Sequence, residues 1–188
     1  MSTLAIVIDC WDPGYPELAV LTPTGRSHYE QVVDNINSIL INSIPYVDAE
    51  IVGVVFATYG TSPLHSAFHW TTADSFKQRV WHHPWATIEL IMPILETFKV
   101  SNILVMGCSW RACLFLRPVG IRRLFPLLHH SHNIQIIPKC CQNGNADPSI
   151  VLEEIGYGLA LDHWRVLPEW SNRYTMNHPD PTSNPPTK

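Results

Sequence analysis

Short apolar runs alternate along the chain with longer segments in which apolar residues recur every three or four positions. The runs have the length of buried strands and cover residues 4–9, 49–58, 103–106 and 133–138. The periodic segments predict helices over residues 27–43, 87–98 and 148–163. Strands that alternate with helices are typical of a parallel sheet covered on both faces, so the pattern predicts a three-layer α/β/α fold.

Local signals refine the ends of these elements. Ser27 followed three residues later by Glu30 has the form of a capping box and predicts that the first long helix starts there. A helix beginning near Trp110 must bend at Pro118, because proline lacks an amide donor and clashes with the preceding turn; residues 121–129 continue it. Residues 59–84 show no periodicity and are predicted to form a long irregular excursion.

Composition narrows the class of protein. The chain has 188 residues, of which 46% are hydrophobic and 15% charged, and a net charge of -4. These values predict one ordinary globular domain over residues 1–167, followed by a Pro- and Asn-rich tail over 168–188. The absence of basic runs argues against nucleic-acid binding, and no apolar stretch is long enough for a bilayer span. We therefore expect a cytoplasmic protein that acts on a small molecule.

The candidate chemistry lies at the ends of two predicted strands. The run that ends at Met106 is followed by Gly107 and, six residues after the glycine, by Cys113. A strand, a tight turn and a helix starting near Ser109 place this cysteine in a first helical turn, where free amides and the helix dipole favour a thiolate. Asp9 ends the first strand, and the carboxyl ends of parallel strands converge, so Asp9 and Cys113 are expected to face each other.

These two segments resemble the isochorismatase-like cysteine hydrolases, a family that includes nicotinamidases, carbamoylases and isochorismatases. The resemblance rests on the strand that ends at Asp9 and on the spacing from Gly107 to Cys113. It implies that Asp9 is the general base and Cys113 the nucleophile. It also implies an oxyanion hole made by the backbone amides of Ala112 and Cys113, and a cis peptide between Cys108 and Ser109.

The family also uses a lysine beside these two residues. Counting back from the aromatic segment before residue 85 places Arg79 at the expected position, with Lys77 two residues earlier, and either could supply the cation. An arginine at this position stabilises an anion but cannot share a proton as lysine does.

Other positions depart from the family. Trp11 stands where a glutamine is common, and Trp11, Ser109 and Trp110 are the predicted substrate-binding residues. Gly60 and Ser62 occupy positions at which nicotinamidases carry metal ligands, so we predict neither this metal site nor a cofactor. The predicted loop also carries four histidines, which are His65, His69, His82 and His83. Two alternatives are open for them: they bind a metal by another geometry, or they pack against neighbouring tryptophans.

Two functions follow from this sequence. The first is a cysteine hydrolase that cleaves a small amide, carbamoyl or related compound through a covalent intermediate on Cys113. The second is a catalytically inactive member of the same fold that serves in binding or assembly. Its contact surfaces would be the aromatic segment over residues 70–85 and the C-terminal tail, and a homo-oligomer could form through them. The chain has five cysteines, Cys10, Cys108, Cys113, Cys140 and Cys141. Their spacing follows no disulfide framework, so we expect reduced thiols. A redox role for these thiols is the third function considered.

Overall fold

The structure is a computed structural model of the whole chain, in which residues 2–43, 51–60, 63–72, 79–108, 113–114, 116–142, 144–145 and 165–166 are described. The predicted helix over 148–163 and the predicted tail lie outside these residues. No helix in the described ranges has the length and apolar character needed to cross a membrane.

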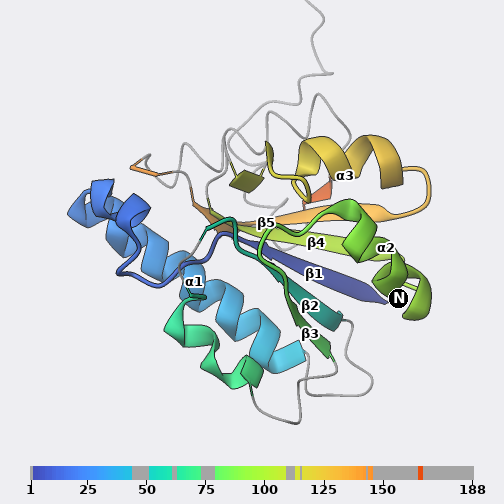
Figure 1. Cartoon of the computed structure of the whole chain (residues 1–188), viewed down its shortest axis with the longest axis horizontal. Coiled ribbons are helices and arrows are strands. Elements are labelled where there is room, and N and C mark those ends of the chain that lie inside the picture. The colour runs from blue at the N-terminus through green and yellow to red at the C-terminus, as the bar shows by residue number, and fades with distance from the viewer. Residues whose placement is uncertain are drawn as a thin grey trace, which may run out of the picture.

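A parallel sheet of six strands forms the centre of the described structure (Figure 1). Its spatial order is β3-β2-β1-β4-β5-β6, so the chain starts in the middle and builds outward in both directions. The strands are β1 (Thr3–Ile8), β2 (Ile51–Ala57), β3 (Val80–His82), β4 (Asn102–Cys108), β5 (Asn133–Gln142) and β6 (Arg165–Val166). Because β1 is central and pairs with both β2 and β4, the residue that follows it lies at the middle of the carboxyl edge.

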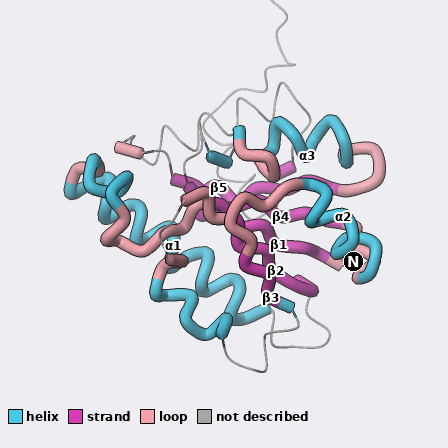
Figure 2. Tube along the Cα trace, in the orientation of Figure 1, coloured by secondary structure: helices cyan, strands magenta, loops and turns pink. Residues whose placement is uncertain are grey.

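Helices cover both faces of this sheet (Figures 1 and 2). One face packs against α1 (Pro23–Ser43) and the 3-10 helix η2 (Ser66–Thr72), and the opposite face packs against α2 (Ile88–Thr97) and α3 (Ile121–Leu128). A further 3-10 helix, η1 (Pro16–Val20), precedes α1. The predicted three-layer α/β/α fold is therefore confirmed.

Strand alternation divides the core into two clusters. Leu4, Ile6 and Ile8 point into the cluster under α2 and α3, whereas Ala5 and Val7 point into the one under α1. All five side chains are almost completely buried. A strand that is buried on both faces has a continuous apolar sequence, which is why the first strand was predictable from its composition.

The first helix starts four residues earlier than the sequence predicts. The Thr22 hydroxyl accepts a hydrogen bond of 3.1 Å from the amide of Gly25, and Pro23 occupies the first helical position. The capping box at Ser27 was therefore wrong: Ser27 lies inside α1, and Glu30 instead contacts His65.

The region between β2 and α2 is more ordered than predicted. Its described residues include η2 and the edge strand β3, which pairs with β2 only from Val80 to His82. A strand of three residues is too short to show a period in the sequence, so the expectation of an irregular excursion was wrong for these segments. Strand β5 also runs on through Pro138 to Gln142, beyond its predicted end.

Candidate active site

Asp9 lies immediately after β1, at the middle of the carboxyl edge of the sheet. Its side chain is fully buried, and its backbone has a φ of 53°, in the left-handed region. The Asp9 amide donates to the carbonyl of Ala57 (2.9 Å), and the Tyr59 amide donates to Oδ1 of Asp9 (2.8 Å). A left-handed backbone conformation costs free energy at a residue other than glycine. Here it directs the Asp9 carboxylate toward the residues that follow β2.

Gly107 brings β4 close to this turn. Gly107 is paired with Ile8 and has a φ of 124°, and a Cβ added there would lie 2.1 Å from the carbonyl oxygen of Ile8. Only glycine fits this position. The glycine recognised in the sequence thus lets the end of β4 pack directly against the end of β1, next to Asp9.

Cys113 lies in the helical segment that follows, and its side chain is half-buried. It contacts both core clusters, which places it at the boundary between the two faces of the sheet. Its thiol forms a hydrogen bond with the Asp9 carboxyl group. The structure therefore brings together the two residues that the sequence analysis singled out as base and nucleophile.

Arg117 completes this cluster, and the sequence analysis missed it. Its Nε donates to Oδ2 of Asp9 at 2.9 Å, and its side chain is also hydrogen-bonded with Cys113. The guanidinium carbon lies 4.6 Å from the centroid of the Tyr59 ring, within the range of a cation–π contact. The signal was the spacing: Arg117 follows Cys113 by four residues, which puts both side chains on one side of a helical turn.

Burial dominates the electrostatics of Asp9. Loss of solvent raises the pKa of Asp9, and the hydrogen bonds with Cys113 and Tyr59, together with the charge of Arg117, offset only part of this rise. Burial lowers the pKa of Arg117, but the nearby Asp9 and Cys113 outweigh this effect and raise it overall. A carboxyl group with a raised pKa next to a permanent cation is suited to accept and return a proton.

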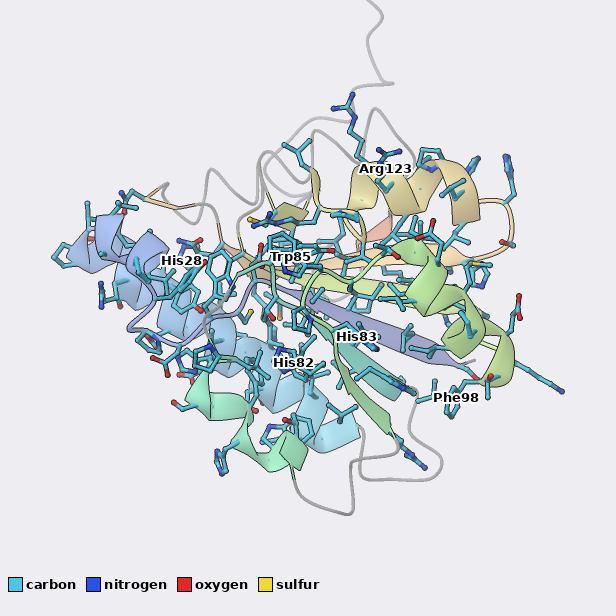
Figure 3. The ribbon with its side chains drawn as sticks, viewed as in Figure 1. His28, His82, His83, Trp85, Phe98 and Arg123 are labelled. Atoms are coloured by element: carbon cyan, nitrogen blue, oxygen red, sulfur yellow. The ribbon has the colours of Figure 1, made fainter. Side chains whose placement is uncertain are left out.

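Two aromatic side chains, Tyr59 and Trp85, lie next to this cluster. Tyr59 is buried, its hydroxyl donates to the carbonyl of Ala86, and burial raises its pKa to about 12. Trp85 stands edge-on to Tyr59 with 5.6 Å between ring centroids. Trp85 is 63% exposed and has a φ of 63°, a rare conformation for a bulky residue. Figure 3 shows Trp85 on the segment that leads from β3 toward α2, in front of the sheet.

The other four cysteines are buried. The thiol of Cys10 donates to the carbonyl of Ile8 at 3.8 Å, and that of Cys141 donates to the carbonyl of Ile137 at 3.4 Å. Burial raises the pKa of Cys108 and of Cys141 well above the usual range, and that of Cys140 to about 12. These groups are protonated at neutral pH. All five cysteines are free thiols, as expected.

Three of the four loop histidines, His65, His69 and His82, have side-chain hydrogen-bond partners. Nδ1 of His65 accepts the amide of Ala67 (3.0 Å), and its Nε2 lies 3.0 Å from Glu30 in α1. Nδ1 of His69 donates to the carbonyl of Ser66, and Nε2 of His82 lies 3.0 Å from the Thr58 hydroxyl. In the part of the chain that the structure describes, no three His, Cys, Asp or Glu residues form a group that could hold a metal ion.

Several predicted site residues are not placed, since Lys77, Ser109, Trp110 and Ala112, with the predicted cis peptide, lie outside the described residues. Arg79 directly precedes β3, where its carbonyl oxygen lies beside Gly53. Gly53 precedes Ala57 by four residues, which is about 13 Å along a strand. The structure does not bring the backbone of Arg79 next to Asp9.

Trp11 is 7% exposed and lies beyond β1, where it forms a bridge with Leu64. Its ring packs against Tyr15 with 4.5 Å between centroids, and its carbonyl accepts the Tyr29 hydroxyl. Its indole nitrogen is buried and has no hydrogen-bond partner among the described residues. A buried donor without a partner is costly, which keeps Trp11 a candidate for contact with a ligand.

No protein-family model matches the sequence, and no curated protein sequence matches it. Solved structures do match. The nicotinamidase from Bacillus subtilis superposes with a TM-score of 0.61 at 14% identity, over 88% of this chain and 99% of that one. The chain has the isochorismatase-like fold. YcaC from Pseudomonas aeruginosa, solved with covalent acrylamide, gives a TM-score of 0.58 at 11% identity, over 94% of this chain and 83% of that one.

A third structure with this fold is the pyrazinamidase from Pyrococcus horikoshii in complex with zinc. It gives a TM-score of 0.54 at 13% identity, over 89% of this chain and 99% of that one. At such identities the likeness establishes the isochorismatase-like fold alone. The chemistry of this chain must therefore be argued from its own residues.

Proposed function

We propose that the chain is a cysteine hydrolase that cleaves the C–N bond of a small amide or carbamoyl compound. The observation that carries this proposal is the junction at Asp9, whose buried carboxyl group interacts with Cys113, Arg117 and the Tyr59 amide. The fold relatives support the reaction class, since two of them are named as a nicotinamidase and a pyrazinamidase.

The first half of the reaction uses Asp9 as a base and then as an acid. Asp9 takes the thiol proton of Cys113 while the sulfur attacks the carbonyl carbon of the substrate. When the tetrahedral intermediate collapses, the C–N bond breaks and Asp9 returns the proton to the leaving nitrogen. An amine or ammonia leaves, and a thioester remains on Cys113.

The second half restores the enzyme. A water molecule attacks the thioester carbonyl as Asp9 accepts one of its protons, and the C–S bond then breaks. The sulfur regains a proton from Asp9, and the acid product leaves. The predicted oxyanion hole at Ala112 and Cys113 would stabilise both tetrahedral intermediates.

The zinc of one fold relative has no matching donor set in the described part of this chain. The ring nitrogens of His65 already contact Ala67 and Glu30, and no three potential ligands gather elsewhere in the described residues. These residues do not fit a bound metal ion, and the proposed steps use only Asp9, Cys113 and water.

A direct test is to incubate the protein with a panel that includes nicotinamide, pyrazinamide, benzamide and N-carbamoyl amino acids, and to measure released ammonia. Rapid acid quenching followed by peptide mass spectrometry would locate the acyl group. We expect turnover with at least one of these compounds, and an acyl adduct on Cys113.

Cys113→Ala should abolish both signals. If wild-type protein releases no ammonia and carries no adduct with any compound, the alternative of an inactive fold used in binding or assembly replaces this proposal. Turnover that survives in Cys113→Ala would exclude Cys113 as the nucleophile.

A further inference from the structure

The cation beside Asp9 comes from the same helical turn as the proposed nucleophile. The amide of Arg117 donates to the carbonyl of Cys113 at 3.1 Å, the i to i+4 bond of one helical turn. Side chains with this spacing project on the same side of a helix. The segment that presents the thiol therefore also presents a guanidinium to the same carboxylate.

Three contacts hold the Arg117 guanidinium in place. Nε donates a hydrogen bond to Oδ2 of Asp9, the guanidinium carbon lies over the Tyr59 ring, and a further hydrogen bond joins the guanidinium to Cys113. Tyr59 is itself anchored through the carbonyl of Ala86. A ring fixed at its far end is a rigid support for the cation above it.

The exposure of this pair has a functional consequence. Asp9 is fully buried, whereas the Arg117 side chain is 29% exposed. A buried carboxylate without a partner would be strongly destabilised, and a guanidinium that is partly solvated supplies the charge at a smaller desolvation cost. Arg117 thus keeps the ionised form of Asp9 available at the sheet edge.

We propose that Arg117 is the cation of the reaction, which holds Asp9 as a carboxylate and stabilises the thiolate of Cys113, so that turnover does not depend on Lys77 or Arg79. This inference rests on the proposed hydrolase function. It assigns to a residue on the nucleophile's own helix the role that the sequence analysis gave to a lysine or arginine before β3.

The charge of Cys113 depends on the titratable groups around its thiol. The titratable or charged side chains that interact with Cys113 include Asp9, Tyr59, Cys108 and Arg117. Tyr59 and Cys108 have raised pKa values and are neutral at pH 7. Of these four, Asp9 and Arg117 act as charges, and arginine does not titrate below pH 10. The thiolate should therefore follow the titration of the Asp9 carboxyl group.

The test compares Arg117→Gln, which removes the charge, with Arg117→Lys, which restores it. Lys77→Gln and Arg79→Gln are the matched controls, because each removes one of the cations predicted from the sequence. The first measurement is the rate of Cys113 alkylation by iodoacetamide between pH 5 and 10, which needs no substrate. The second is kcat and KM for an amide that the wild-type protein hydrolyses.

Loss of a charge at this distance should raise the pH midpoint of Cys113 alkylation by about one pH unit or more in Arg117→Gln. kcat should fall by about a hundredfold, with a smaller change in KM. Arg117→Lys should recover part of both effects, and the two controls should stay within about twofold of wild type. Near-ultraviolet circular dichroism and the melting temperature will establish that each variant is folded.

The outcomes separate the two proposals. If wild-type Cys113 is alkylated selectively and a folded Arg117→Gln has the wild-type midpoint, this inference is wrong and the hydrolase proposal stands. The same conclusion follows if Lys77→Gln or Arg79→Gln produces the shift. If wild-type Cys113 reacts no faster than the buried thiols and no amide is hydrolysed, both proposals fail together.

Discussion

Five cysteines at one edge of a sheet have two very different environments. Cys10, Cys108, Cys140 and Cys141 are buried, and burial raises the pKa of the last three. Cys113 is half-buried and contacts the Asp9 carboxyl group and the Arg117 guanidinium. The same side chain is thus an inert core residue in one place and a candidate nucleophile a few residues away.

What separates the two environments is the route of the backbone. Cys108 ends β4 and points into the cluster under α1. Cys113, by contrast, lies beyond the end of β4 in a helical segment, where its thiol meets the Asp9 carboxyl group. Sequence composition alone cannot distinguish these thiols, because the distinction depends on which strand end each one follows.

The largest effect is expected when one cysteine is removed from each environment. Cys113→Ala should reduce turnover by a factor on the order of 10^4 or more, because it removes the proposed nucleophile beside Asp9. Cys140→Ala, the matched control in the core, should keep turnover within about twofold and lower the free energy of unfolding by about 1 kcal/mol. Steady-state kinetics and urea unfolding measure the two effects, and an active Cys113→Ala would end the distinction.

A second variant tests the close approach that separates Cys108 from Cys113. Gly107→Ala places a methyl group against the Ile8 carbonyl in a left-handed backbone, and should lower the free energy of unfolding by about 3 kcal/mol or more. Gly144→Ala is the control, since its φ is 57° but nothing lies within 4 Å of the added Cβ.

Gly144→Ala should lower the free energy of unfolding by about 1 kcal/mol, which is the conformational cost of the left-handed backbone alone. Chemical denaturation of both variants gives the comparison. Equal costs at the two glycines would show that the contact with Ile8 is not what requires glycine at position 107.

The pH dependence of stability sharpens the account of Asp9. Its folded pKa is raised above the ordinary value of 3.8, so between these two values the native state binds more protons than the unfolded chain. The free energy of unfolding contributed by Asp9 is therefore full below pH 3.8 and falls as pH rises through the folded pKa, by about 1.4 kcal/mol per unit of the rise.

Asp9→Asn removes this group and should abolish that part of the slope. Urea unfolding of both proteins from pH 4 to 8 measures the difference between them, from which all other titrating groups cancel. A difference that does not change over this range would mean that burial leaves the Asp9 pKa at its usual value.

The last prediction concerns Trp85, the exposed aromatic residue beside Tyr59. Trp85 is exposed and strained, and contributes little to the core, so Trp85→Ala should change the melting temperature by only a few degrees. We expect KM for an aromatic amide to rise by about tenfold and KM for an aliphatic amide to change little. Equal changes for both substrates would indicate that the tryptophan does not contact the ring.

Much of the central sheet was predictable from sequence. Strands such as residues 4–9 and 103–106 are buried on both faces, so their apolar runs are unbroken and easily recognised. The edge strand β3 was missed because three residues carry no period. The start of α1 was misplaced because Ser27 and Glu30 match a capping box, whereas Thr22 and Pro23 provide the actual cap.

The site was predictable in part. Asp9 lies where the end of the first strand predicts it, whereas Gly107, expected just after a strand, lies inside β4; Cys113 follows from the glycine spacing. Arg117 was not predicted, because a helix expected to bend at Pro118 does not fix which side chains lie beside Cys113. The contact with Tyr59 could not be foreseen, since it joins residues far apart in the chain across the ends of two strands.

Of the five cysteines, Cys113 should be the activated one. The most direct test is to treat the folded protein with iodoacetamide at pH 7 and to follow each cysteine by peptide mass spectrometry over time. The account predicts that Cys113 is labelled at least about ten times faster than any of the four buried thiols. Labelling of all five at similar rates, or of a buried cysteine first, would contradict it.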